Sequence, residues 1–224
     1  MRRLEKPNSP HGGYMKSRFK QKNKKNRWAD HLTQKAKTEK YPARSVYKLM
    51  EIQKKFKVIQ KNSRILDLGC APGSWLIYAS KIAGPEGKVT GIDLKEIKIQ
   101  LPANAVFFKG DIFNMESSLD MKSGLAESIG KDYKTVLSDM APSTTGRKEI
   151  DAARSFDLCM AALNCALELL SCGGNFVCKI FQGNDFKRFE SEVKKNFMHC
   201  NIFKPESCRK ASKEIYIIGK TKKN

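Results

Sequence analysis

The sequence predicts an α/β domain in which helices cover both faces of a mostly parallel, doubly wound sheet. Short apolar runs rich in β-branched residues recur along the chain, and most are separated by stretches of helical character, as in a series of β-α-β units. The last two apolar runs are joined only by residues 205–213, a link that favours an antiparallel hairpin over a crossover. The expected sheet is therefore mostly parallel with an antiparallel C-terminal strand.

The expected elements follow in order along the chain. Two helices come first, at 28–38 and 45–57, and Ser45 is the expected N-cap of the second. Strands are predicted at 64–69, 88–93, 105–111, 135–139, 175–181, 200–204 and 214–219. Further helices are predicted through 75–79, near 115–129, from about 150 to 170 and near 184–197.

Positive charge is concentrated at the N-terminus. The chain has 224 residues, with 43 Lys and Arg against 23 Asp and Glu, a formal net charge of +20. Residues 1–40 hold 13 Lys and Arg and 3 Asp and Glu, so half of the excess, +10, lies in this segment. Residues 1–26 offer little to bury and are predicted to form a flexible basic arm before a single domain spanning 27–224; a solubilising tail is the alternative. The charge indicates a polyanionic partner.

Composition argues against several classes of protein. No run approaches the roughly 18 apolar residues of a membrane span, and the N-terminus lacks the apolar core of a signal peptide, so a cytoplasmic protein without membrane contact is expected. The 7 cysteines include no Cys-x-x-Cys pair and are expected to be reduced. None of the 3 histidines is spaced as part of a ligand pair, so no metal site is expected. We expect a monomer.

Acidic residues lie where the first three expected strands end, and ligands of doubly wound sheets bind at this edge. The first strand runs into the turn Asp67-Leu68-Gly69-Cys70-Ala71-Pro72-Gly73, whose Gly-x-x-x-Gly spacing differs from the Gly-x-Gly-x-x-Gly of dinucleotide folds. Asp93 ends the second strand, where a carboxylate can accept hydrogen bonds from ribose hydroxyls. Asp111 ends the third strand and is placed to accept from an exocyclic amine.

These acids suit a ligand that contains a nucleoside but no phosphate. S-Adenosyl-L-methionine has an adenine, a ribose and a cationic sulfonium, which a basic pocket would repel and acidic side chains attract. For any one acid alone, a solvated carboxylate at a strand end is the simpler interpretation. Together with the glycine turn, the acids favour the cofactor.

Several motifs resemble those of one enzyme family. They are Arg27-Trp28, Arg44-Ser45-Val46-Tyr47-Lys48-Leu49, DLGCAPGSW at 67–75, SDMAP at 138–142, KIFQG at 179–183 and Ser212-Lys213-Glu214-Ile215-Tyr216-Ile217. From about Arg27 to Lys220 the chain resembles the FtsJ-type methyltransferases, which methylate a uridine ribose 2′-hydroxyl in 23S rRNA of the large ribosomal subunit. The resemblance implies a Rossmann-like S-adenosylmethionine-dependent methyltransferase fold. Two departures are a Gly-Ser-Trp turn, where the family often has Gly-Gly-Trp, and a longer basic arm.

The resemblance also implies the site residues. The family's catalytic Lys-Asp-Lys-Glu tetrad falls by motif on Lys48, Asp139, Lys179 and Glu214. Its cofactor contacts fall on Gly73, Trp75, Asp93, Asp111 and Asp139. No tetrad member is missing, so the resemblance implies an active enzyme.

Methyl transfer is an in-line displacement, so the site must hold the ribose oxygen close to the methyl group and manage the proton that leaves. Lys179, at the end of its strand, is the candidate for this task. It either takes the proton as a general base or stays an ammonium that stabilises the developing alkoxide. Asp139 can orient Lys179 and the cofactor, while Lys48 is a second cation that disfavours a charge on Lys179. The sequence leaves both roles open.

The functional prediction is an S-adenosylmethionine-dependent RNA 2′-O-ribose methyltransferase acting on 23S rRNA in the large ribosomal subunit. Transfer RNA or another RNA is an alternative substrate, since the basic arm does not specify one. A non-catalytic RNA-binding or ribosome-assembly factor is a second alternative, which the intact tetrad opposes. The glycine spacing and the charge oppose a nicotinamide-dependent oxidoreductase.

Overall fold

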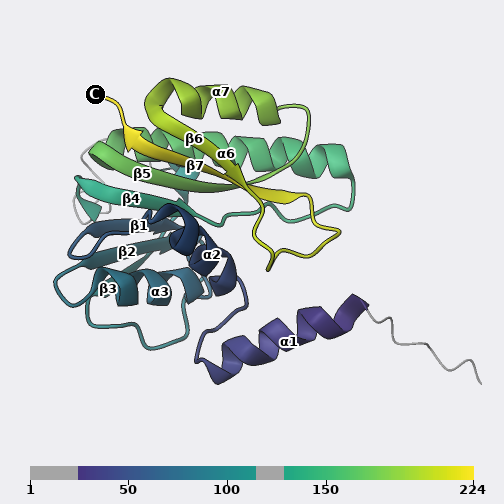
Figure 1. Ribbon diagram of the computed structural model, residues 1–224, viewed down its shortest axis with the longest axis horizontal. Helices are drawn as coiled ribbons and strands as arrows, with labels where there is room; N and C mark the ends of the chain where they lie inside the picture. The colour runs from purple at the N-terminus through teal and green to yellow at the C-terminus, as the bar shows by residue number, and fades with distance from the viewer. Residues whose placement is uncertain (1–24, 115–128) are drawn as a thin grey trace, which may run out of the picture.

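The computed structural model describes residues 25–114 and 129–224, and its seven strands form one sheet (Figure 1). The strands are β1 (Arg64–Leu68), β2 (Lys88–Asp93), β3 (Ala105–Lys109), β4 (Tyr133–Ser138), β5 (Leu170–Phe181), β6 (Phe197–Phe203) and β7 (Glu214–Lys222). They are arranged in the order β3-β2-β1-β4-β5-β7-β6. Strands β1 to β5 pair in parallel, and β7 is antiparallel to both β5 and β6. The doubly wound sheet and its antiparallel C-terminal strand are confirmed.

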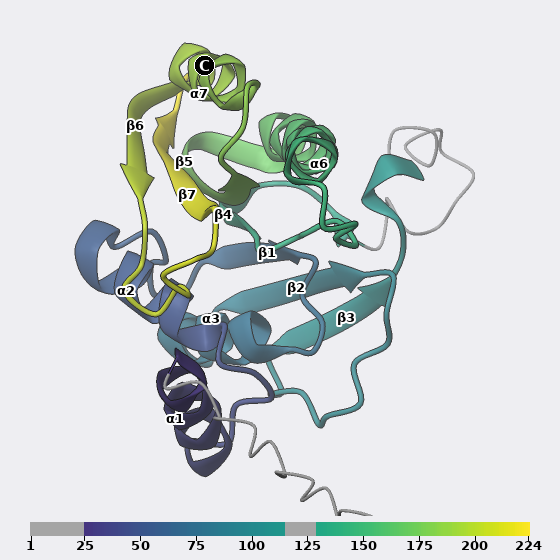
Figure 2. The same ribbon diagram turned by 90° about the vertical axis from the view of Figure 1, so that its right-hand side faces the viewer.

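Helices cover both faces of the sheet (Figure 2). The helices are α1 (Lys25–Thr38), α2 (Val46–Phe56), α3 (Ser74–Ala83), α6 (Lys148–Leu169) and α7 (Phe186–Asn196), with a short 3₁₀ turn η1 (Ile112–Asn114) after β3. Residues of α2 and α3 pack into the core on one face, and residues of α6 and α7 pack into the core on the other. Helix α1 lies outside α2 and α3, against which Leu32 and Ala36 pack. Among the described residues, no helix has the length and apolar character needed to cross a bilayer.

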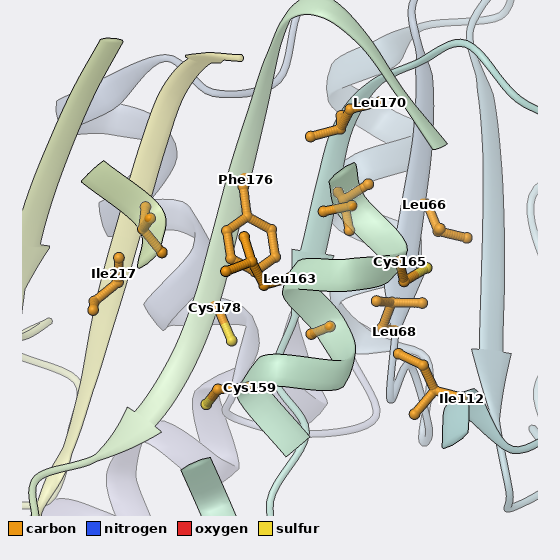
Figure 3. Close-up of a cluster of buried hydrophobic side chains, with 14 of the residues drawn as sticks. Leu66, Leu68, Ile112, Cys159, Leu163, Cys165, Leu170, Phe176, Cys178 and Ile217 are labelled. Carbon is orange, nitrogen blue, oxygen red and sulfur yellow. The ribbon is translucent and has the colours of Figure 1, made fainter. Parts of the chain in front are cut away.

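The period of two along each strand divides the sheet's side chains between these faces. On β5, Phe176, Cys178 and Ile180 join the core under α6 and α7, whereas Val177 joins the core under α2 and α3. Figure 3 shows the first of these cores, with Leu163 of α6 beside Phe176. Residues of β5 with odd numbers therefore face α2, which decides where Lys179 lies.

Several boundaries differ from the expected ones. Helix α1 begins at Lys25, so the last two residues of the expected arm are helical, and the rest of that arm lies outside the described residues. The helix expected near 115–129 also lies outside them, except at its last residue. Strand β3 ends at Lys109. Strand β5 begins at Leu170 because this residue pairs with Tyr133 before a register shift in the β4–β5 ladder.

Ser45 occupies the N-cap position of α2 but makes no capping hydrogen bond with its side chain. Its backbone is already helical, with φ −58° and ψ −22°, whereas capping side chains usually belong to residues with extended backbone. Its carbonyl instead accepts hydrogen bonds from the backbone N–H of Lys48, at 3.1 Å, and from the indole N–H of Trp75, at 2.8 Å. Ser45 is thus the N-cap residue, as expected, although its side chain makes no capping hydrogen bond.

The 7 cysteines are all free thiols, as expected, and five of them are buried.

Candidate active site at the carboxyl ends of the strands

Four charged side chains meet where α2 crosses the ends of β4, β5 and β7. Lys179 on β5 lies directly opposite Tyr216 on β7, and Glu214 lies two residues before Tyr216 on the same strand face. This is the face that α2 covers, since Ile218 packs in one core with Leu49 of α2. Helix α2 brings Lys48 to this face, and Asp139 follows the last residue of β4.

The tetrad forms two ion pairs. Lys48 Nζ lies 2.8 Å from Glu214 Oε1, and both side chains are 13% exposed. Lys179 Nζ lies 3.0 Å from Asp139 Oδ1, and these side chains are 7% and 16% exposed. Lys179 also donates a hydrogen bond to the backbone carbonyl of Asp139. The structure therefore brings together all four residues that the sequence assigned to catalysis.

The two pairs are electrostatically coupled through Asp139. Burial alone raises the pKa of this carboxyl, but Lys179 and Lys48, together with the Tyr216 hydroxyl, outweigh burial and lower it. Burial alone lowers the pKa of Lys48, but the carboxylates of Asp139 and Glu214 outweigh burial and raise it. At neutral pH, Asp139 is thus a carboxylate and Lys48 an ammonium.

Tyr216 is a site residue to which the sequence analysis gave no role. Its hydroxyl donates to Asp139 Oδ1 at 2.7 Å, the same oxygen that pairs with Lys179. Burial, with the nearby carboxylates of Asp139 and Glu214, raises its pKa well above the usual value, so it remains a donor. The signal was present in the sequence, because a residue two positions after Glu214 shares its strand face.

The glycine turn between β1 and α3 requires glycine at two positions. Gly69 has φ +73°, and a Cβ there would lie 2.4 Å from Met140 Cγ, in the loop after β4. Gly73 is the N-cap of α3 with φ +106°, and a Cβ there would lie 2.8 Å from Ile99 Cδ1. Both values of φ are ones that side chains with a Cβ rarely adopt. The turn can therefore pass close to the loops that follow β2 and β4.

A pocket of about 360 Å³ opens beside this turn. Asp93 and Asp111 line it together with Asp139. Asp93 accepts backbone N–H bonds from Ala71 at 2.9 Å and Lys95 at 2.8 Å, and Asp111 accepts one from Phe113 at 3.0 Å. Carboxylate oxygens have further lone pairs, so both acids can still accept hydrogen bonds from a ligand.

Two of the expected cofactor contacts lie outside the lining of this pocket. Gly73 faces Ile99, as described above, and Trp75 is only 2% exposed. The Trp75 ring lies 5.9 Å from the Tyr216 ring, centroid to centroid. Trp75 therefore supports the tyrosine that binds Asp139.

Asp67 is a fully buried carboxyl whose two oxygens have no hydrogen-bond partner. Burial, followed by the charges of Asp139 and Asp93, raises its pKa well above the usual value. An unpartnered buried carboxylate is costly, so the raised pKa favours the uncharged acid. Asp67 does not line the pocket, and the sequence analysis gave it no separate role.

A larger hollow of about 620 Å³ lies along α6, lined by Phe156, Met160 and Arg188 among others, and holds none of the tetrad. Within the described residues, no cluster of three or more His, Cys, Asp or Glu side chains is arranged to hold a metal ion.

Comparison with known proteins shows the family to which the chain belongs. The FtsJ-like methyltransferase family matches residues 41–222. The chain belongs to this family. A protein of Desulforapulum autotrophicum named ribosomal RNA large subunit methyltransferase E is 64% identical over 93% of this chain and its own full length. A protein of Desulfosudis oleivorans with the same name is 54% identical over 87% of this chain and 91% of its own.

Two solved structures share the fold. A Plasmodium falciparum protein named as a putative ribosomal RNA methyltransferase matches with a TM-score of 0.68 and 29% identity over 81% of this chain and 98% of its own. Fibrillarin from Aeropyrum pernix, solved with bound S-adenosyl-L-methionine, matches with a TM-score of 0.50 and 16% identity over 72% of this chain and 68% of its own. The second match concerns the fold alone. Together with the sheet order, these matches confirm the Rossmann-like methyltransferase fold.

Proposed function

We propose that this FtsJ-like methyltransferase uses S-adenosyl-L-methionine to methylate the ribose 2′-hydroxyl of a uridine in 23S rRNA of the large ribosomal subunit. The observation that carries the proposal is the pair of buried ion pairs, Lys179–Asp139 and Lys48–Glu214, beside a pocket lined by acids. The names of the relatives support a ribosomal RNA substrate.

The acidic pocket suits the cofactor. Asp93 is placed to accept from the ribose hydroxyls, and Asp111 from the exocyclic amine of the adenine. Asp139, which lines the pocket as a carboxylate, supplies negative charge that favours a cationic ligand. When bound, S-adenosylmethionine supplies an electrophilic methyl group and a positive charge.

Lys179 is the group we assign to take the proton of the 2′-hydroxyl. The amine form of Lys179 can accept that proton, and its Nζ lies 3.0 Å from Asp139 Oδ1. Lys48 allows this, because it also neutralises Asp139 and remains charged through its own pair with Glu214. Asp139 therefore keeps a cationic neighbour when Lys179 becomes a free amine that can act as a base.

The remaining residues position these groups. Tyr216 and Lys179 share one oxygen of Asp139, which fixes the orientation of that carboxylate. Glu214 holds Lys48, and both are mostly buried, so their geometry is well defined. Because catalytic efficiency depends strongly on the placement of reacting groups, such restraints matter for the rate.

Transfer of labelled methyl groups to RNA tests the proposed function. The purified protein is incubated with methyl-labelled S-adenosylmethionine and with large ribosomal subunits from a strain lacking the enzyme, free 23S rRNA or tRNA in parallel. We expect label in 23S rRNA, in a uridine whose 3′ linkage resists alkaline hydrolysis. Label only in tRNA would overturn the ribosomal assignment, and label in no RNA would overturn RNA methylation.

Removing residues 1–24, before α1, is expected to weaken RNA binding and flatten its salt dependence. The deleted segment holds eight Lys and Arg and one Asp or Glu. For every phosphate that the shortened protein no longer neutralises, the slope of log affinity against log salt should become shallower by about 0.7 to 0.9. Filter binding at several salt concentrations measures the slope, and calorimetry with the cofactor is the control, which should not change. An unchanged slope would show that the segment does not contact RNA.

Substituting Asp67→Asn is expected to stabilise the ligand-free protein and to leave cofactor binding unchanged. The raised pKa of Asp67 means that its burial costs stability as pH rises from the unfolded value, about 3.9, towards the folded one. The asparagine has no such cost, so its advantage in unfolding free energy should grow with pH over this range. Cofactor affinity should change little, because Asp67 does not line the pocket and its raised pKa favours the uncharged acid. Urea unfolding across pH and calorimetry measure the two effects; an advantage that does not change with pH would contradict the assignment.

A further inference from the structure

The connection between β6 and β7, residues 204–213, is held by the same helix that carries Lys48. Glu51 lies on α2, and its Oε2 accepts a hydrogen bond from the backbone N–H of Glu206 at 2.6 Å. Its Oε1 accepts from the N–H of Ser207 at 2.9 Å. Arg44 Nη2 donates to the carbonyl of Ser207 at 2.7 Å. The backbone of Ser207 is therefore held by two hydrogen bonds, from its N–H to Glu51 and to its carbonyl from Arg44.

This connection leads directly to Glu214. Ser207 and Cys208 are buried, and the Cys208 thiol lies near the Glu214 carboxylate. Burial, followed by this carboxylate, raises the pKa of Cys208 to about 12, so the thiol keeps its proton. The N–H of Glu214 donates to Ser212 Oγ at 3.2 Å. The connection thus restrains the backbone of Glu214.

Two of these residues lie on one side of α2. Lys48 and Glu51 are three residues apart in the helix, which brings them to the same face, whereas Arg44 lies two residues before the first helical residue, Val46. On that face Lys48 pairs with Glu214, and Glu51 binds the connection, residues 204–213, that precedes Glu214. Loss of the hydrogen bonds from Glu51 to residues 206 and 207 would therefore alter the distance between Lys48 and Glu214.

The connection also carries charge that a polyanion would attract. Its exposed cations are Lys204, Arg209, Lys210 and Lys213. The phosphates of an RNA bound near the tetrad would attract these side chains electrostatically. The two charge-assisted hydrogen bonds of the Glu51 carboxylate oppose a displacement of residues 204–213 towards the RNA.

We infer that Glu51 is a positioning residue for methyl transfer. By fixing residues 206 and 207 it determines the distance between Lys48 and Glu214 without touching the reacting groups. The inference rests on the proposed function. Glutamine cannot replace Glu51 fully, because its amide has one accepting oxygen and its NH₂ group would face a second N–H donor.

The test is a double-mutant cycle between Glu51 and Glu214, measured as single-turnover methyl transfer to 23S rRNA. Glu51→Gln is expected to lower the rate about tenfold and to leave the KM for the cofactor unchanged, since Glu51 does not line the cofactor pocket. In a Glu214→Gln background, Glu51→Gln should lower the rate less than twofold, because residues that act through one another are not additive. The matched control is Glu192→Gln, which removes a helical carboxylate paired with Lys195 on α7 and should leave the rate unchanged.

Equal losses in the two backgrounds, or a Glu51→Gln rate within twofold of wild type, would overturn the inference. If Glu51→Gln does not fold, Glu51→Asp takes its place in the cycle, because its carboxylate keeps two acceptors at a shorter reach; its loss should likewise disappear in the Glu214→Gln background. A wild-type protein that transfers no methyl group refutes the proposed function instead, so the two failures are distinguishable.

Discussion

Replacing Lys179 with methionine is expected to lower the single-turnover rate of methyl transfer about 10³-fold. Methionine is unbranched and fills much of the same space, but it can neither accept a proton nor carry charge. Cofactor affinity serves as the control and should change little, since Lys179 does not line the pocket. A rate within tenfold of wild type would show that Lys179 is not essential to the reaction.

Arginine at the same position separates the two roles that the sequence leaves open for Lys179. A guanidinium keeps its proton throughout the accessible pH range, so it can stabilise an alkoxide but cannot serve as a base. We expect Lys179→Arg to be as slow as Lys179→Met. Recovery of the rate by arginine to within tenfold of wild type would instead assign Lys179 a purely electrostatic role.

The sheet was predictable from the sequence because its signals are local. The apolar runs predicted as strands at 64–69 and 88–93 match β1, which ends at Leu68, and β2, since buried parallel strands are nearly continuous apolar segments. The acids Asp93 and Asp111 were also found from position alone, because they follow neighbouring strands of one sheet. The tetrad was different: its four members were assigned through resemblance to a family, and the structure then showed them paired.

Contacts between distant segments were not predictable. Glu51 and the N–H that it binds on Glu206 are 155 residues apart, and no pattern in either segment indicates the other. Asp67 appears in the sequence as one acid within a strand and turn, whereas its lack of a hydrogen-bond partner follows from packing around it. Tyr216 lies between these cases, since its strand face could be inferred but its partner Asp139 could not.

The second large effect is expected for Asp139→Asn, in both stability and activity. Asparagine keeps an oxygen that can accept the Tyr216 hydroxyl but removes the charge that pairs with Lys179 and attracts Lys48. Breaking a buried ion pair by neutralising one partner costs about 3–5 kcal/mol, because the other charge is left uncompensated. We expect a loss of this size in the unfolding free energy at pH 7, measured in urea, and methyl transfer about 10³-fold slower.

The pH dependence and a second substitution test the cause of this loss. Because the folded pKa of Asp139 is lowered, its stabilising effect is present above the unfolded value, about 3.9, and is lost as pH falls through the folded one. The difference between wild type and Asp139→Asn should therefore shrink in acid. Adding Lys179→Met to Asp139→Asn removes the uncompensated ammonium, so the double variant should be more stable than the sum of the two single losses predicts. Strictly additive losses would show that Asp139 acts on stability through contacts other than its pair with Lys179.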